Sequence, residues 1–150
     1  MPHVIITGGP GMQQAGGYFS PQTFRDGEFI LALKRAYLSL DGTQLAIRAV
    51  LVEPMLKQSP YFFAARHDEG VIFKVDPATA QLRTDGVKWA IAVLALEYLQ
   101  RATAEYPSVH IARTNLARQI KGIWAARGGP PPSVVPHQLD TFSQEPAAAE

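Results

Sequence analysis

Histidines and carboxylates are the side chains of this chain with the most potential for catalysis or metal binding. The four histidines are His3, His67, His110 and His137. No two of them have the i, i+4 spacing that places a pair of imidazoles on one face of a helix as metal ligands. His67-Asp68-Glu69 falls in a predicted hairpin turn, whereas catalytic groups are usually buried among converging partners. We therefore predict a protein that is not an enzyme, with no catalytic residue, no metal site and no cofactor.

A glycine-rich stretch near the N-terminus has the composition of a nucleotide loop but not its motif. Thr7-Gly8-Gly9-Pro10-Gly11 follows a short β-branched run. A phosphate loop would continue with Gly-Lys-Ser/Thr, and a dinucleotide site would open a helix at the glycines. Here Met12-Gln13-Gln14 follows, and Gly16-Gly17 and Pro21 break the chain. We expect a flexible arm, and a small enzyme with a ligand pocket formed by this arm is our third functional interpretation.

A group of basic and aromatic residues suggests nucleic-acid binding instead. If residues 29–53 form a hairpin about Asp41-Gly42, Arg35 lies opposite Arg48, and like charges in that position are unfavourable without a counter-charge. Basic residues and an aromatic ring on one antiparallel sheet could hold a single strand. The candidate contacts are Arg35, Tyr37, Arg48, Arg66 and Lys74. The competing interpretation is a pair of solvated arginines, or arginines paired with acids of a neighbouring subunit.

A long apolar helix, residues 85–101, is the element on which the other predicted elements must pack. Thr84 or Asp85 can cap it, because either side chain can accept a hydrogen bond from a free N–H group of the first turn. One stripe comprises Val87, Ile91, Leu94 and Tyr98, and the opposite side carries Trp89, Val93 and Leu96. A helix that is apolar nearly all round is normally buried. It is too short for a bilayer, which needs about 20 apolar residues.

Residues 29–53 are open to two interpretations. The spacing of apolar residues from Phe29 to Leu40 is helical, but Asp41-Gly42 suits a two-residue hairpin turn. The hairpin register pairs Leu40 with Thr43, Leu38 with Leu45, Ala36 with Ile47, Leu33 with Val50 and Leu31 with Val52. We favour the hairpin because the pairing stays consistent over many residues.

The remaining segments complete an α+β prediction. A second hairpin is expected from runs 61–66 and 71–75, and a second helix from Val109 to about Arg127. The expected fold is an antiparallel sheet of about four strands, made of two hairpins and followed by two packed C-terminal helices. We divide the chain into a Gly/Pro-rich arm (1–28), one domain (29–127) and an extended Pro-rich tail (128–150). Without the first hairpin, the domain would be mainly helical.

Composition limits the class of protein. The chain has 150 residues, 47% of them apolar, which is enough for a core, and it has no cysteine. Its formal charge of +1 gives no global attraction to nucleic acid or acidic lipid. The sequence shows no secretory signal and no transmembrane segment, so we expect a cytoplasmic or virion protein without a membrane partner.

The first functional interpretation is a non-enzymatic structural subunit of a multi-subunit assembly. The helix has a second apolar face that a second helix or another subunit must cover, and the tail has few apolar anchors of its own. The expected interface residues are Trp89, Val93, Leu96, Val135, Leu139 and Phe142. Accessory, connector and decoration proteins of phage particles have comparable architecture. The partners would be further copies of the chain and other protein subunits, with single-stranded nucleic acid as the partner in the alternative interpretation.

Overall fold

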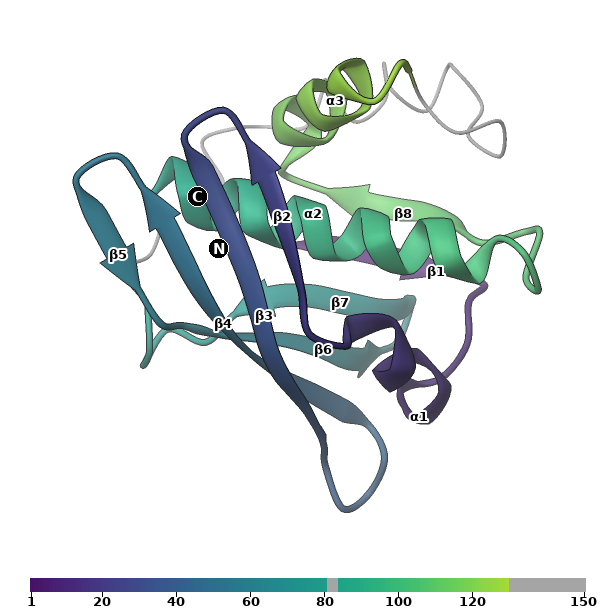
Figure 1. Ribbon diagram of the computed structural model, residues 1–150. Coiled ribbons are helices and arrows are strands. Elements are labelled where there is room, and N and C mark those ends of the chain that lie inside the picture. The colour runs from purple at the N-terminus through teal and green to yellow at the C-terminus, as the bar shows by residue number, and fades with distance from the viewer. Residues whose placement is uncertain (81–83, 130–150) are drawn as a thin grey trace.

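The computed structural model describes residues 1–80 and 84–129, and its main feature is an eight-stranded antiparallel sheet (Figure 1). The strands are β1 (Val4–Thr7), β2 (Gln22–Asp26), β3 (Phe29–Leu38), β4 (Gln44–Glu53), β5 (Leu56–Gln58), β6 (Tyr61–His67), β7 (Gly70–Val75) and β8 (His110–Thr114). The helices are α1 (Met12–Ala15), the 3-10 helix η1 (Gly16–Phe19), α2 (Asp85–Ala102) and α3 (Ala117–Ala126). The strand order is β2-β3-β4-β6-β7-β1-β8, with β5 added beside β4.

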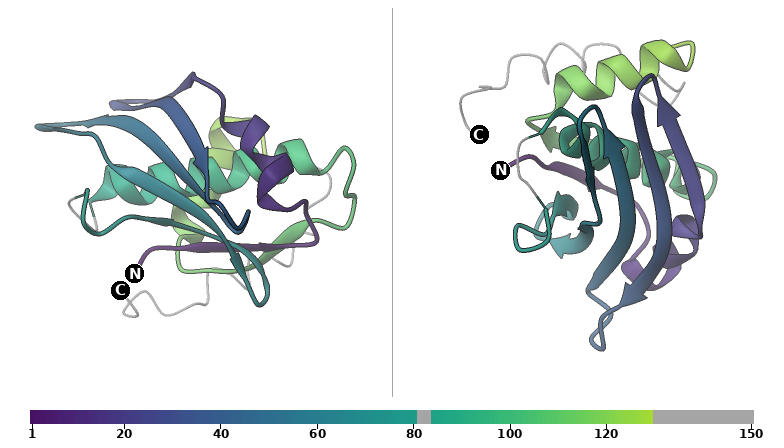
Figure 2. Two further views of the ribbon diagram at one scale, coloured as in Figure 1. Left: turned by 90° about the horizontal axis from the view of Figure 1, so that it is seen from below. Right: turned by 60° about the vertical axis from the view of Figure 1, so that its left-hand side comes forward.

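The sheet curls into a half-barrel around α2 (Figure 2). Its inner face and α2 share one hydrophobic core. The β3–β4 hairpin extends beyond the rest of the sheet in both figures. The expected sheet of about four strands followed by two packed helices is therefore wrong. Half of the strands were not predicted, and strand β8 follows α2 in the chain, so the sheet is not complete before the helices begin.

The hairpin formed by β3 and β4 is confirmed, and its register is the predicted one near the turn. Arg35 pairs with Arg48, and Leu38 pairs with Leu45. Beyond a bulge between Leu33 and Arg35, the register shifts by one residue, so that Leu33 faces Ala49 and not Val50. The turn is longer than two residues, because β3 ends at Leu38 and β4 begins at Gln44. The second predicted hairpin, β6 with β7, is also confirmed.

The flexible N-terminal arm in our expected fold is wrong. β1 is an interior strand that pairs with β7 on one side and β8 on the other, and Val4, Ile5 and Ile6 are buried. The His3 N–H group donates to Asn115 Oδ1 over 2.9 Å, and the Thr114 hydroxyl donates to the His3 carbonyl over 2.7 Å. These contacts fix the start of the chain against β8.

The single helix expected from Val109 to Arg127 is wrong, because its first part is strand β8. Val109 and Ile111 are buried on the inner side, two residues apart, which is the strand period. The change to α3 follows Thr114, whose hydroxyl accepts a hydrogen bond from the Leu116 N–H group over 2.9 Å. Periodicity favoured a helix here because a five-residue strand has too few repeats to outweigh the helical stripe that continues into α3.

The central helix is confirmed, and so is its cap. The Thr84 hydroxyl accepts a hydrogen bond from the Val87 N–H group over 3.1 Å. Glu53, at the end of β4, accepts hydrogen bonds from the Thr84 hydroxyl over 2.8 Å and from the Gly86 N–H group over 3.2 Å. A carboxylate at a helix N-terminus is stabilising, so this contact anchors α2 to the sheet.

Residues 130–150 lie outside the described part of the chain, and the expected contacts of Val135, Leu139 and Phe142 lie there with them. Among residues 1–80 and 84–129, no helix combines the length and the apolar character that crossing a bilayer requires.

Candidate nucleic-acid interface

The outer face of the sheet, opposite α2, carries two adjacent cross-strand rows of basic and aromatic residues. In the first row, Arg35 pairs with Arg48, which pairs with Tyr61. The second row contains Tyr37, Ala46, Phe63 and Lys74, each paired with the next. We call Arg35, Tyr37, Arg48, Tyr61, Phe63 and Lys74 the outer basic patch. The flanking residues in these strands, including Leu45, Ile47, Phe62 and Phe73, are buried in the core.

The β-bulge in β3 is what aims Arg35 outward. Leu33 is buried on the inner face, and strict alternation would place Arg35 on that same face. The bulge adds one residue between them, so Arg35 shares the outer face with Arg48 and is exposed. The bulge thus places Arg35 and Arg48 opposite each other in one row, although they carry like charges.

The cations of the outer basic patch have no acidic partner in the described part of the chain. Arg35, Arg48 and Lys74 form no ion pair and no side-chain hydrogen bond there, and neither row contains an acid. The Arg35 guanidinium lies 5.9 Å from the centroid of the Tyr37 ring, whose residue is 44% exposed. Asp76 follows β7 beside Tyr61, and its carboxylate accepts the Ala78 N–H group over 3.0 Å.

The other predicted site residues lie elsewhere. Arg66 pairs with Val71, whose side chain is in the core, and it lines a pocket at the end of the inner face. Trp89, Val93 and Leu96 are buried within the chain, with the Phe29 ring 5.5 Å from Trp89 and α3 packed against α2. The second apolar face of α2 is therefore covered by residues of the same chain in this structure.

Sequence reasoning did not identify Tyr61 and Phe63 as members of the patch. Both lie in a hairpin that the sequence predicted, and alternation gives their common face. The missing information was the antiparallel pairing of β4 with β6, which brings them beside Arg48 and Ala46. No local signal specifies which hairpins become neighbours.

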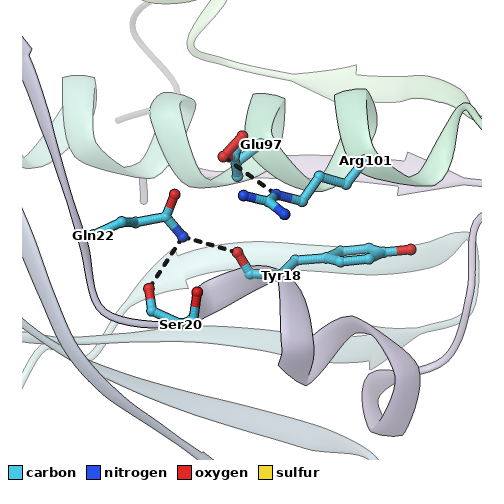
Figure 3. A network of polar contacts seen from close by, with 5 residues as sticks. All are labelled: Tyr18, Ser20, Gln22, Glu97 and Arg101. Atoms are coloured by element: carbon cyan, nitrogen blue, oxygen red, sulfur yellow. Dashed lines mark hydrogen bonds and ion pairs between the residues drawn. The ribbon is translucent and has the colours of Figure 1, made fainter.

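Two separate sets of polar contacts lie near each other, one linking η1 to β2 and one within the C-terminal part of α2 (Figure 3). Gln22 Nε2 donates to the Tyr18 carbonyl over 3.0 Å and to the Ser20 carbonyl over 3.1 Å. On α2, Glu97 is buried and pairs with Arg101 across 3.5 Å. Figure 3 shows both α2 side chains facing the segment that carries Tyr18. Tyr18 and Ser20 take part through their backbone carbonyls, and these residues include no histidine, so we assign the contacts a structural role.

Tyr98 fastens the glycine-rich loop that follows β1 to α2. Its hydroxyl donates to the Pro10 carbonyl over 2.7 Å, and its ring packs 5.4 Å from the Phe73 ring. Burial raises the pKa of the Tyr98 hydroxyl well above its ordinary value, and the nearby Tyr18 and Tyr106 hydroxyls raise it further. The folded protein therefore holds the Tyr98 proton more tightly than the unfolded chain does.

We predict that Tyr98 makes folding sensitive to alkaline pH. The unfolded chain releases this proton near a pKa of about 10, while the folded state still binds it. The stabilisation is complete below that pKa and is lost as pH rises toward the folded value, at up to about 1.4 kcal/mol per pH unit. Urea unfolding between about pH 8 and 11 measures this slope. Tyr98→Phe should flatten it and the exposed control Tyr37→Phe should not; equal slopes in all three proteins would contradict the assignment.

The fold and this surface define a class of α+β proteins in which a curled antiparallel sheet encloses a central helix and presents a basic, aromatic outer face. No protein-family model, curated protein or solved structure shows significant similarity to this chain. Within residues 1–80 and 84–129, no three histidine or acidic side chains are grouped as they would be around a metal ion.

Proposed function

We propose that this protein binds single-stranded nucleic acid on the outer basic patch. The observation that supports this function is the pair of rows across β3, β4, β6 and β7. They place Arg35, Arg48 and Lys74, which have no acidic partner among the described residues, beside the rings of Tyr37, Tyr61 and Phe63.

The chemistry of the patch fits a chain of phosphates and bases. Guanidinium groups bind phosphate oxygens through two parallel hydrogen bonds, and aromatic rings stack on unpaired bases. Ala46 lies between Tyr37 and Phe63 in the second row, so a small side chain separates two rings on the same face. Stacking requires bases that are free of a complementary strand, which favours single-stranded over duplex ligands.

We place this function ahead of a structural subunit because of where the interface residues lie. Trp89, Val93 and Leu96 are part of the chain's own core. The tail residues expected to contact a partner lie outside the described part of the chain. The patch is local, so a formal charge of +1 for the whole chain is compatible with it.

We expect binding of a fluorescein-labelled oligothymidylate to be weak and strongly dependent on salt. Three cations that neutralise about three phosphates give a slope of roughly −2 for log K against log salt. Reversing the charge in Arg35→Glu or Arg48→Glu should weaken binding at least about tenfold. It should also make the slope of log K against log salt shallower, by at least the amount that one phosphate contact contributes. Fluorescence anisotropy at several salt concentrations measures both quantities.

Arg118→Glu is the matched control, because Arg118 is exposed on α3, away from the patch. It changes net charge by the same amount and should leave binding nearly unchanged. Phe63→Ala should weaken binding of the oligonucleotide by about tenfold through lost stacking. Equal affinities for the Arg48→Glu and Arg118→Glu proteins would overturn the proposal, as would the absence of binding at low salt.

A further inference from the structure

A second surface, independent of the outer basic patch, lies at the end of the inner face of the sheet. It is a pocket of about 270 Å³ between the loop after β1, the turns of both hairpins and α2. Five of its lining residues are glycines, from three separate segments: Gly8, Gly9, Gly11, Gly42 and Gly70. We call it the glycine pocket. Backbone rather than side chains therefore forms much of its wall.

Arg66 is the charged residue of the glycine pocket. Among the residues that the structure describes, none that lines the pocket is acidic, and the Arg66 side chain forms no ion pair or hydrogen bond with any of them. Its backbone is fixed, because its N–H group donates to the Thr43 carbonyl over 2.8 Å. A cation held at the rim of a small pocket without a counter-charge attracts an anionic group.

The floor of the pocket is apolar. Met12 and Val71 line it and keep a small exposed surface, whereas Ile6 also lines it but is fully buried. Tyr98 also lines the pocket, and its hydroxyl donates a hydrogen bond to the Pro10 carbonyl, so that hydroxyl has only acceptor capacity left. A ligand that suits these walls has an apolar body as well as its charged group.

Gly11 is the lining glycine that neither packing nor a positive φ requires. A Cβ on Gly9 would overlap the Tyr98 hydroxyl, so that glycine is required for packing. Gly11 has an ordinary φ of −71°, and a Cβ there would meet nothing within 4 Å. Gly11 lines the pocket, so a side chain could be introduced at its edge without displacing a neighbouring residue. The N–H groups of Gly9 and Gly11 donate no hydrogen bond within the described residues, so they are free to contact a ligand.

We propose that the glycine pocket binds a small organic anion, with a carboxylate or phosphate group at Arg66 and a short apolar body against Met12 and Val71. The volume is near the lower end of the range for ligand pockets, about 300–1,000 Å³, and suits a body of a few carbon atoms. The proposal does not depend on nucleic-acid binding, because Arg66 faces away from the outer basic patch.

Two-dimensional ¹H–¹⁵N NMR of the full chain tests this inference without nucleic acid present. The probes are sodium butyrate, propyl phosphate, sodium acetate and 1-butanol, with sodium chloride as the ionic-strength reference. We expect saturable shifts of the Gly9, Gly11, Gly42 and Gly70 amides with butyrate or propyl phosphate. Affinity should be at least several-fold lower for acetate, which lacks the apolar body, and about tenfold lower for uncharged 1-butanol. The stronger of the two larger anions identifies the charged group.

Two variants test the two parts of the proposed site. Arg66→Met keeps an apolar side chain of similar reach and should weaken anion binding at least about tenfold. Gly11→Leu should fill the pocket and abolish the shifts, whereas Gly17→Leu, also without neighbours within 4 Å of its Cβ, lies outside the pocket and should bind as the parent does. Unfolding curves confirm that each variant is folded. Shifts that 1-butanol or sodium chloride reproduces, binding that survives Arg66→Met, or no saturable shift would overturn the inference.

Discussion

Gly70→Ala should leave little folded protein. Gly70 begins β7 with a φ of +141°, which side-chain-bearing residues rarely adopt. A Cβ at this position would overlap the carbonyl oxygen of Ile6, and Ile6 cannot withdraw because β1 is paired on both sides, with Val71 and with Ile111. The backbone strain and the steric overlap add, so we expect the free energy of unfolding to fall by more than about 4 kcal/mol.

Urea unfolding followed by circular dichroism measures this loss. Gly42→Ala is the matched control, because Gly42 also has a positive φ, +74°, but a Cβ there would meet nothing within 4 Å. It should cost only the conformational strain, about 1 kcal/mol. If the two alanine variants lost similar stability, the close approach of the β6–β7 turn to β1 would be contradicted.

Leu96→Asp should unfold the protein without first dispersing an oligomer. Leu96 is 2% exposed and lies on the α2 face that, from the sequence, could have faced another subunit. In the structure this face is part of the chain's own core, so a carboxylate there loses its hydration and the leucine packing is lost as well. We expect a loss of more than about 3 kcal/mol in the free energy of unfolding.

Light scattering during size exclusion, together with urea unfolding, separates the two roles of this helix face. Gln100→Asp, at an exposed position in the last turn of the same helix, controls for a new charge on α2 and should cost no more than about 1 kcal/mol, because an anion there opposes the helix dipole. A folded Leu96→Asp protein with parental stability and a smaller native mass would show that the face is intersubunit and would contradict the intramolecular core.

Local sequence determined the elements whose signals are long or chemically distinctive. Asp85–Ala102 is helical because strong helix formers follow a capping threonine, Thr84. The β3–β4 hairpin follows from alternation around Asp41-Gly42, and Asp41 supports the turn by accepting hydrogen bonds from Ser39 and Thr43. Short-range geometry alone specifies these features, which is also why Arg35 was correctly placed opposite Arg48.

Tertiary structure decided the features that depend on partners distant in the chain. Val4–Thr7 is an interior strand only because β7 and β8 supply hydrogen-bonding edges, and His110–Thr114 is a strand only because β1 lies beside it. The bulge before Arg35 and the neighbouring positions of β4 and β6 assemble the outer basic patch, while Arg66 is placed on the opposite face. Sequence periodicity shows which residues can share a face, but pairing between distant strands decides which faces meet, because a short strand gains its hydrogen bonds and its burial only from neighbours that the local sequence does not specify.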